Sequence, residues 1–291
     1  GVLPQPNNTA RPADLQPNAV WIDARSDGSP EAVYFYGEGP TVISFDPISQ
    51  RYRHQVNPYT DTTYYFLSLG GAPGLQIEPY NPPVPASIKT VNTFENYWLY
   101  EKEAVNLLKS GREWWGDYLG TTPSLNLEPE FPGLVPGSEA LLSFGAIASA
   151  QVPTRFLWQA GGAAIGEQTA GTVSTYRYDL KAQKAEADFK FPVATGADEK
   201  LKLNVTYDKN GQAGASAYLD YVSLQVKCRL RQYAAPTLFR IPPATTGNPA
   251  LEFGSTDSNF ILWDVTDPLK PAVCTFHKKD NGSISLVPQT P

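Results

Sequence analysis

The amino-acid sequence predicts an all-β protein built from two β-sandwich domains of jelly-roll-like character, with at most one short helix. Short runs of β-branched and aromatic residues end at turn residues along most of the chain, which is typical of sandwiches and barrels. The 27 Pro and 23 Gly residues are scattered between these runs, so they act as turn residues rather than as a low-complexity tract. Strands do not alternate with long helical segments, which argues against a doubly wound α/β domain.

The first part of the chain alternates strand-like runs with turns. Residues 1–17 are rich in Pro and Asn, so we expect them to be extended or loose. Strands are expected at 32–36, 41–45 and 62–69, because each is a β-prone run that ends at Gly, Pro or Asp.

Residues 94–119 break this strand rhythm. Phe94, Trp98, Val105 and Leu108 recur at a spacing that could form one stripe of a helix, and a glycine that suits a helix end follows. We therefore expect at most one short helix here. The aromatic stretch after that glycine is expected to fold back onto a sheet.

A change of composition at residues 121–123 marks the expected domain boundary, which gives domains at 1–122 and 123–291. The Lys-Asn-Gly sequence at 209–211 is typical of a hairpin turn. The short, regularly spaced strands of the second domain indicate a jelly-roll-like sandwich. They are expected at 139–147, 154–159, 176–180, 186–191, 201–207, 218–230, 259–265 and 272–277.

Charge and hydropathy exclude several classes of protein. The formal net charge is −6 and no run of Lys or Arg is present, so a nucleic-acid partner is not expected. No apolar run approaches the ~20 residues of a membrane-spanning helix. The chain begins with Gly, so we expect a mature or trimmed piece whose compartment cannot be inferred from a missing leader.

Only two cysteines are present, Cys228 and Cys274. In a secreted protein they could pair, and a disulfide closing such a loop would stabilise the fold by roughly 4 kcal/mol on the chain-entropy model. The alternative is a pair of half-buried thiols that never meet. One sequence does not give the distance between them, so both possibilities stay open.

The residues that usually carry catalysis or metal binding are sparse. Cys274 and His277 lie three apart in an expected strand, so their side chains should point to opposite faces and form no dyad. His54 is expected at the surface near a strand end. A zinc site needs about four clustered ligands and no Cys-x-x-Cys pair exists, while the glycine-rich stretches lack the Lys of a phosphate loop. We expect Asp264 and Asp267 to cap a turn, and we expect no catalytic residue, metal or cofactor.

Aromatic residues form the one feature that resembles a binding surface. They cluster in residues 97–118: Tyr97, Trp98, Tyr100, Trp114, Trp115 and Tyr118. Exposed aromatic platforms stack against sugars, which makes a carbohydrate-binding module a rival interpretation. The favoured alternative is a hydrophobic cluster packed between a loop and the sheet.

Several phrases, taken in order, resemble one known family. Glu103 stands where the family pattern has Asp, which is a small departure. The phrases are TTYYFL at 62–67 followed by Gly70, YEKE at 100–103, NLLKSGREWWG at 106–116, YLDYV at 218–222 and WDVTDP at 263–268. Together they resemble the β-domains that precede the catalytic domain of gingipain-like cysteine peptidases, in particular the sortases of the type IX secretion system.

That resemblance implies a secreted protein at the outer membrane or cell surface of a bacterium. In the family an α/β peptidase domain with a His/Cys dyad follows these β-domains, and no part of this chain matches it, so no catalytic residue is carried over. We therefore expect a non-catalytic scaffold that packs on the peptidase domain of the same polypeptide. Other secretion components or a surface polysaccharide are further expected partners. The expected interface residues are Arg112, Trp114, Trp115, Tyr118, Trp263 and Asp264.

Overall fold

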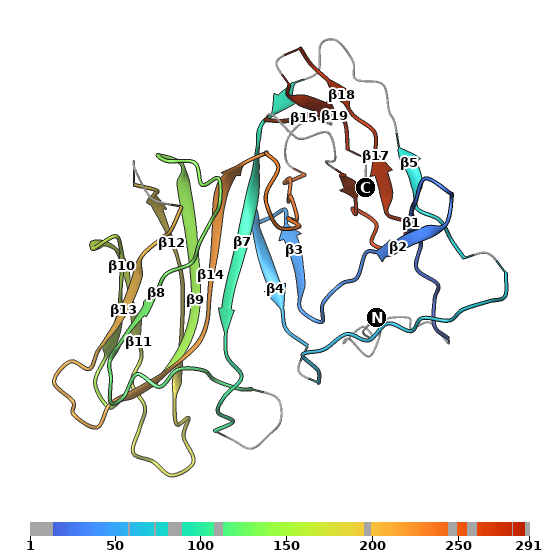
Figure 1. Cartoon of the computed structure of the whole chain (residues 1–291). Coiled ribbons are helices and arrows are strands. Elements are labelled where there is room, and N and C mark those ends of the chain that lie inside the picture. Colours follow the sequence, from blue (N-terminus) through green and yellow to red (C-terminus); the bar gives the residue numbers. More distant parts are fainter. Residues whose placement is uncertain are drawn as a thin grey trace. The chain divides into compact units, whose positions relative to one another are not determined.

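The computed structural model of the chain contains strands and turns, and no helix is present in the residues it describes (Figure 1). These residues are 14–57, 59–72, 74–80, 89–107, 113–194, 199–243, 249–254, 261–280 and 282–288. The all-β class predicted from the sequence is confirmed. The sequence allowed at most one short helix at 94–119, and the described part of that region contains none, because its start lies in the strand Thr93–Glu101.

The chain divides into two compact units, and both ends of the chain belong to the same one. The terminal unit comprises Gly1–Asn92, Leu230–Ala234 and Pro242–Pro291, and the jelly-roll unit comprises Thr93–Arg229 and Ala235–Ile241. This division differs from the boundary expected near residue 122. The reason is long-range pairing: β7 (Thr93–Glu101) pairs with β14 (Ser216–Arg229) over its full length, so it belongs with the strands that follow residue 122.

The jelly-roll unit is a sandwich of two four-stranded sheets, ordered β12-β9-β14-β7 and β11-β10-β13-β8. Its strands nest as antiparallel pairs around the β10–β11 hairpin: β9 with β12, β8 with β13 and β7 with β14. This rolled-up arrangement is the jelly-roll topology. The remaining bounds are β8 (Ser124–Leu127), β9 (Glu139–Ser149), β10 (Thr154–Ala160), β11 (Ala163–Ala170), β12 (Gln183–Pro192) and β13 (Leu203–Asp208).

The interior of the sandwich is filled by aromatic side chains from both sheets. Phe144 of β9 lies 5.7 Å from Phe156 and 5.1 Å from Trp158, both of which come from β10 in the facing sheet. Tyr207 of β13 packs on Phe156 at 5.1 Å, and all four side chains are almost fully buried. Alternation of buried and half-buried residues, as in β13, is what a strand with one face on the core requires.

The terminal unit consists of small sheets that join distant parts of the chain. One has the order β18-β19-β15-β6, another has the order β16-β17-β5, and β1-β2 and β3-β4 are two-stranded. Parallel pairing brings residues 78–80 of β5 beside residues 272–274 of β17, and residues 90–91 of β6 beside residues 250–251 of β15. The bounds are β1 (Val20–Ala24), β2 (Pro30–Phe35), β3 (Val42–Asp46), β4 (Arg51–Gln55), β5 (Glu78–Tyr80), β6 (Thr90–Val91), β15 (Ala250–Phe253), β16 (Trp263–Asp264), β17 (Ala272–Cys274), β18 (His277–Lys278) and β19 (Ile284–Leu286).

Several strands were predicted in the wrong place. Residues 62–69 and 176–180 contain no strand, although both are rich in β-prone aromatic residues. The expected strand at 272–277 is two short strands, β17 and β18, which belong to different sheets. A β-prone sequence forms a strand only where a partner edge is available, and these segments have none in the described structure.

The turn predicted at 209–211 is present but does not close a hairpin. Asn210 and Gly211 both have positive φ, 49° and 79°, as a two-residue turn of this kind requires. The strands on either side, β13 and β14, lie in different sheets of the sandwich, so the turn connects the two layers.

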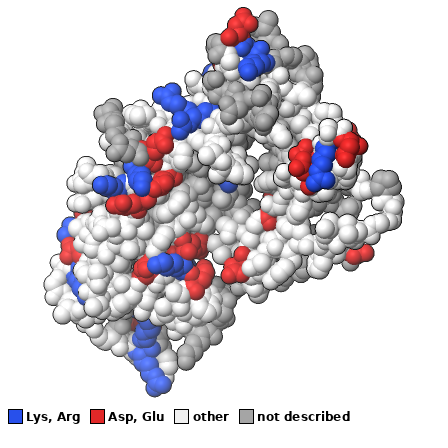
Figure 2. All heavy atoms as spheres, viewed as in Figure 1, with Lys and Arg blue, Asp and Glu red and all other residues white. Residues whose placement is uncertain are grey.

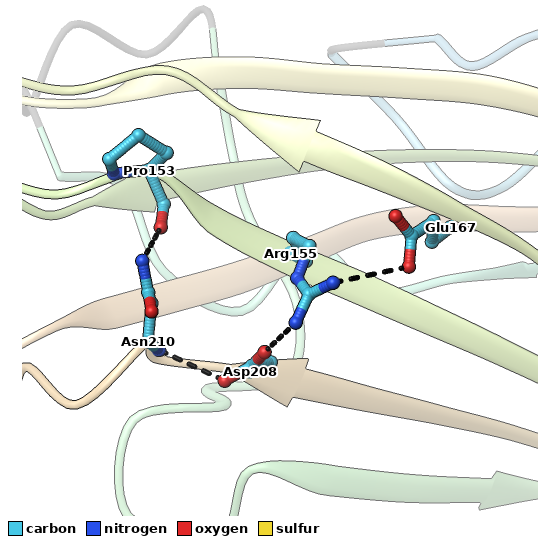
Figure 3. Close-up of polar contacts among 5 residues, drawn as sticks. All are labelled: Pro153, Arg155, Glu167, Asp208 and Asn210. Carbon is cyan, nitrogen blue, oxygen red and sulfur yellow. Dashed lines mark hydrogen bonds and ion pairs between the residues drawn. The ribbon is translucent and has the colours of Figure 1, made fainter.

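A polar cluster fixes this turn to the neighbouring strand (Figure 3). The Asn210 backbone N–H donates to Asp208 Oδ1 at 2.9 Å, and its side chain donates to the Pro153 carbonyl at 3.0 Å. Arg155 donates to Asp208 at 2.7 Å and lies 3.5 Å from Glu167. The hydrogen bonds from Asn210 and Arg155 lower the pKa of Asp208. These polar groups are exposed or half-buried, and they form hydrogen bonds and ion pairs with one another. We therefore assign the cluster a structural role.

Candidate interaction surface of the jelly-roll unit

Residues 113–119 form a short extended segment beside β14. The Gly116 N–H donates to the Leu219 carbonyl at 2.7 Å, and the Leu119 N–H donates to the Ala217 carbonyl at 2.8 Å. Trp115 exchanges two backbone hydrogen bonds with Val105, at 2.8 and 2.9 Å. The segment thus occupies the part of the β14 edge that lies beyond β7, which pairs with residues 221–229.

The aromatic residues of this segment have different environments. Trp115 is 7% exposed, whereas Trp114 is 37% and Tyr118 is 46% exposed. Tyr118 packs on Tyr218 of β14 with ring centroids 4.9 Å apart. The aromatic cluster expected from the sequence is therefore divided: Trp115 belongs to the interior, while Trp114 and Tyr118 present ring surface to solvent.

A polar network joins this segment to the end of β7. The Tyr100 hydroxyl donates to Asp117 Oδ2 at 2.6 Å, and Lys102 Nζ lies 2.7 Å from Asp117 Oδ1. The bond to Asp117 is the main cause of the raised pKa of Lys102, and burial followed by the same carboxylate raises the pKa of Tyr100. Asp117 therefore connects the segment to two residues at the end of β7, Tyr100 within the strand and Lys102 directly after it, which holds the segment in register.

A β-bulge in β14 brings carboxylates together on the outer face of the sheet. Glu101, Tyr221, Gly145 and Glu186 lie in one row across β7, β14, β9 and β12. The register shifts between residues 219 and 221, so Asp220 is the extra residue of the bulge. A Cβ added to Gly145 would lie 2.6 Å from the Tyr221 ring and 3.4 Å from the Asp220 carboxylate, so glycine leaves room for both.

Two of these carboxylates, Glu101 and Asp220, have raised pKa values. Burial, followed by the charges of Asp220 and Glu103, raises the pKa of Glu101 to about 8. Burial and the charge of Glu103 are the main causes that raise the pKa of Asp220 to about 6. The Lys184 ammonium opposes this rise, and it also lies over the Trp115 ring at 5.9 Å.

We expect the stability of the jelly-roll unit to fall as pH rises from about 4.5 to about 8. Because the pKa values of Glu101 and Asp220 are raised in the folded protein, the folded state binds more protons than the unfolded chain over this range. Glu101→Gln should remove most of the slope and raise stability at pH 8 by roughly 1–3 kcal/mol, a value reduced from the full shift for partial solvent screening. Urea midpoints measured from pH 5 to 8.5 provide the test.

The matched control is Glu139→Gln in β9, whose exposed carboxylate pairs with Lys190 at 2.7 Å. This change should leave the pH slope as it is in the unmodified protein. A pH profile that is equally steep with and without the Glu101 carboxyl would contradict the assignment.

The other predicted interface residues lie elsewhere. Arg112 falls outside the described residues. Trp263 and Asp264 form β16 of the terminal unit, and Asp264 is buried with its Oδ1 accepting from the Thr266 N–H at 3.0 Å. The Leu269 N–H donates to Asp267 in the same way, so both aspartates cap turns as expected. The aromatic segment and the 263–264 strand are thus parts of separate units.

The cysteines are buried thiols in separate units, and the structure contains no disulfide between them. Cys228 lies in β14 of the jelly-roll unit and Cys274 in β17 of the terminal unit. Burial raises the pKa of Cys274 to about 12, and the Asp264 charge adds to the rise. A thiol in that state is a poor nucleophile.

Metal and membrane features are limited in the described ranges. Within them no group of three or more His, Cys, Asp or Glu side chains is arranged to hold a metal ion. The same residues include no helix that is long and apolar enough to cross a membrane. On the face drawn in Figure 2, acidic and basic side chains lie in small mixed groups.

The carboxylate row was not predicted from the sequence. Glu101, Asp220 and Glu186 are far apart along the chain, and only the register of β7, β14 and β12 brings them together. The sequence did contain a signal: acidic residues occur inside strand-like runs, and acidic residues are unusual on the half-buried face of a sheet. The bulge at Asp220 sets the direction of the Asp220 side chain. No local sequence pattern indicates that bulge.

Comparison with known proteins finds a solved structure of similar fold. No protein-family model matches the sequence, and no curated protein matches it. The crystal structure of dimeric latent PorU from Porphyromonas gingivalis matches 99% of this chain with a TM-score of 0.84 at 22% identity. The match covers 27% of the PorU chain, so this chain spans about a quarter of that length. At this identity the match shows a shared fold.

Two carbohydrate-binding modules match in part. One is the CBM36-1 domain of a multidomain xylanase from the hindgut metagenome of Trinervitermes trinervoides, with a TM-score of 0.29 at 9% identity over 44% of this chain and 96% of that one. The other is CBM36 in complex with calcium and xylotriose, with a TM-score of 0.27 at 12% identity over 46% of this chain and 99% of that one. Scores this low carry no argument about function.

Proposed function

We propose that this chain is the non-catalytic scaffold part of a cell-surface, gingipain-like peptidase related to the type IX secretion sortases. The observation that carries the proposal is the match to latent PorU over 99% of this chain, which leaves most of that longer chain uncovered. In this proposal the uncovered part corresponds to a peptidase domain on which the two β-units pack. The short phrases between residues 62 and 268 that resemble this family give independent support from the sequence.

The chemistry of the described residues agrees with a structural role. Asp117, Asp208 and Asp264 each stabilise a turn or segment through hydrogen bonds, and the Cys274 thiol is buried with a raised pKa. These side chains are thus used in contacts within the chain itself. In the proposal, peptide-bond cleavage belongs to the peptidase domain.

Calorimetric titration of this chain into the separately expressed peptidase domain of the parent polypeptide tests the proposal. We expect saturable binding, accompanied by a change in the rate at which the domain hydrolyses a peptide substrate. Absence of binding at high micromolar concentration would contradict the scaffold role and point to an external ligand.

A carbohydrate-binding module is the second candidate. It is favoured by the exposed rings of Trp114 and Tyr118, which lie on a jelly-roll unit together with the row of carboxylates. Aromatic faces and carboxylates are groups that stack on and hydrogen-bond to sugars. Affinity electrophoresis in surface polysaccharides tests this candidate, and equal mobility in every gel with and without glycan would eliminate it.

A further inference from the structure

The terminal unit contains a long uncharged stretch whose first half, residues 62–69, forms no strand, while Gln76 near its end forms a β-bridge with Val20. Residues 62–77, TTYYFLSLGGAPGLQI, carry no charged side chain, and Asp61 and Glu78 flank them. Residues 62–69 were expected to form a strand because of their β-branched and aromatic composition. In the structure they run without strand pairing.

The apolar side chains of this stretch are unusually exposed. Phe66 is 78%, Leu67 is 84% and Leu69 is 92% exposed to solvent. Single exposed apolar residues are ordinary on protein surfaces, whereas a run of large ones marks an interaction site. An exposed, uncharged and β-prone run also invites uncontrolled pairing with other chains unless a partner covers it.

The stretch is nevertheless held against the rest of its unit. The Tyr65 hydroxyl accepts a hydrogen bond from the Glu38 N–H at 2.7 Å and donates to the Glu38 carbonyl at 3.1 Å. The Tyr65 ring packs on Phe35 at 5.1 Å and lies directly over Gly37. One side chain is thus anchored while its neighbours Phe66 and Leu67 face solvent.

The adjacent strand β2 extends the same kind of surface. Val33, Tyr34 and Phe35 are all exposed, and among the described residues β2 pairs with β1 alone. We call residues 33–35 and 64–69 together the apolar strap. Its two segments are connected through the contact of Phe35 with Tyr65.

We propose that the apolar strap is the docking surface for the peptidase domain, with residues 64–69 adding as a strand to an open sheet edge of that domain. This inference rests on the proposed function. The proposed function supplies the occupant. The match covers 27% of the PorU chain, and in that proposal the uncovered part corresponds to the peptidase domain, which is large enough to cover a surface that is exposed here. Main-chain pairing would provide affinity, and Phe66 and Leu67 would fill apolar pockets beside the edge.

The chemistry of the strap predicts a characteristic binding signature. Because residues 62–77 carry no charge, the affinity should change little between low and high salt, unlike binding that depends on ion pairs. Burial of the apolar side chains should give a negative heat-capacity change.

The test is calorimetric titration of the peptidase domain with this chain and with the double variant Phe66→Ser, Leu67→Ser. Both side chains are solvent-exposed, so the variant should fold, which circular dichroism and an unchanged urea midpoint verify. Loss of central apolar contacts should weaken binding on the order of 30-fold or more. The control is Leu180→Ser in the jelly-roll unit, which is 70% exposed and should bind like the unmodified chain.

The outcomes separate this inference from the function on which it rests. If the unmodified chain binds and the double variant binds equally tightly, the docking surface lies elsewhere while the scaffold role stands. If the unmodified chain does not bind, both proposals fail. If light scattering shows that the double change abolishes self-association while peptidase-domain binding is retained, the strap covers a second copy of this chain and the inference is overturned.

Discussion

Trp115→Ala is expected to destabilise the jelly-roll unit by about 3–5 kcal/mol, the range found when a buried Trp is truncated. The indole is 7% exposed, and its backbone exchanges hydrogen bonds with Val105 beside β14. Truncation leaves a cavity under the segment and removes the ring over which Lys184 lies. Urea denaturation followed by tryptophan fluorescence or circular dichroism measures the loss.

The neighbouring residue provides a matched control. Trp114 is 37% exposed, so Trp114→Ala should cost about 1 kcal/mol or less. If Trp115→Ala leaves the midpoint unchanged and weakens only partner binding, the indole is a surface contact and the packing described above is incorrect.

Phe144→Ala should have an effect of the same size for a different reason. Phe144 is fully buried and contacts Phe156 and Trp158 of the facing sheet as well as Phe189 of its own sheet. Truncation therefore opens a cavity between the two layers, at a cost of about 3–5 kcal/mol. Thermal and urea unfolding of the purified variant give this value.

Leu141→Ala serves as the control on the same strand. Leu141 is half-buried and points to the opposite face of β9 from Phe144, so its truncation should cost only about 1 kcal/mol. Equal losses for the two variants would mean that Phe144 is not at the centre of the interior.

Strands β9, β10, β12, β13 and β14 of the jelly-roll unit were predicted because they are β-prone runs bounded by turn residues, whereas β7, β8 and β11 were not. Buried and accessible residues alternate in β13, and β9 and β14 are long β-prone runs. A short helix near residue 94 stayed possible from the sequence because Phe94 and Trp98 are four residues apart, and a spacing of four fits both a helical stripe and one face of a strand. In the structure both lie on β7.

The arrangement of the units and of the carboxylate row was not predictable in the same way. Parallel pairing of β5 with β17 and of β6 with β15 joins residues that are far apart in sequence, and no local pattern encodes such a partner. The same limit applies to Glu101 and Asp220, which meet through strand register and a bulge. Residues 62–69 show the converse case, since strand-forming composition alone did not supply a partner strand.

Differential hydrogen exchange tests the central claim most directly, by comparing this chain alone with the same residues inside the parent polypeptide. The scaffold role predicts slower exchange over a continuous surface in the parent, including residues 64–69, with unchanged exchange in buried strands such as β9. Identical exchange at every amide in both forms would show that these β-units do not pack on the peptidase domain, and would contradict the proposed function.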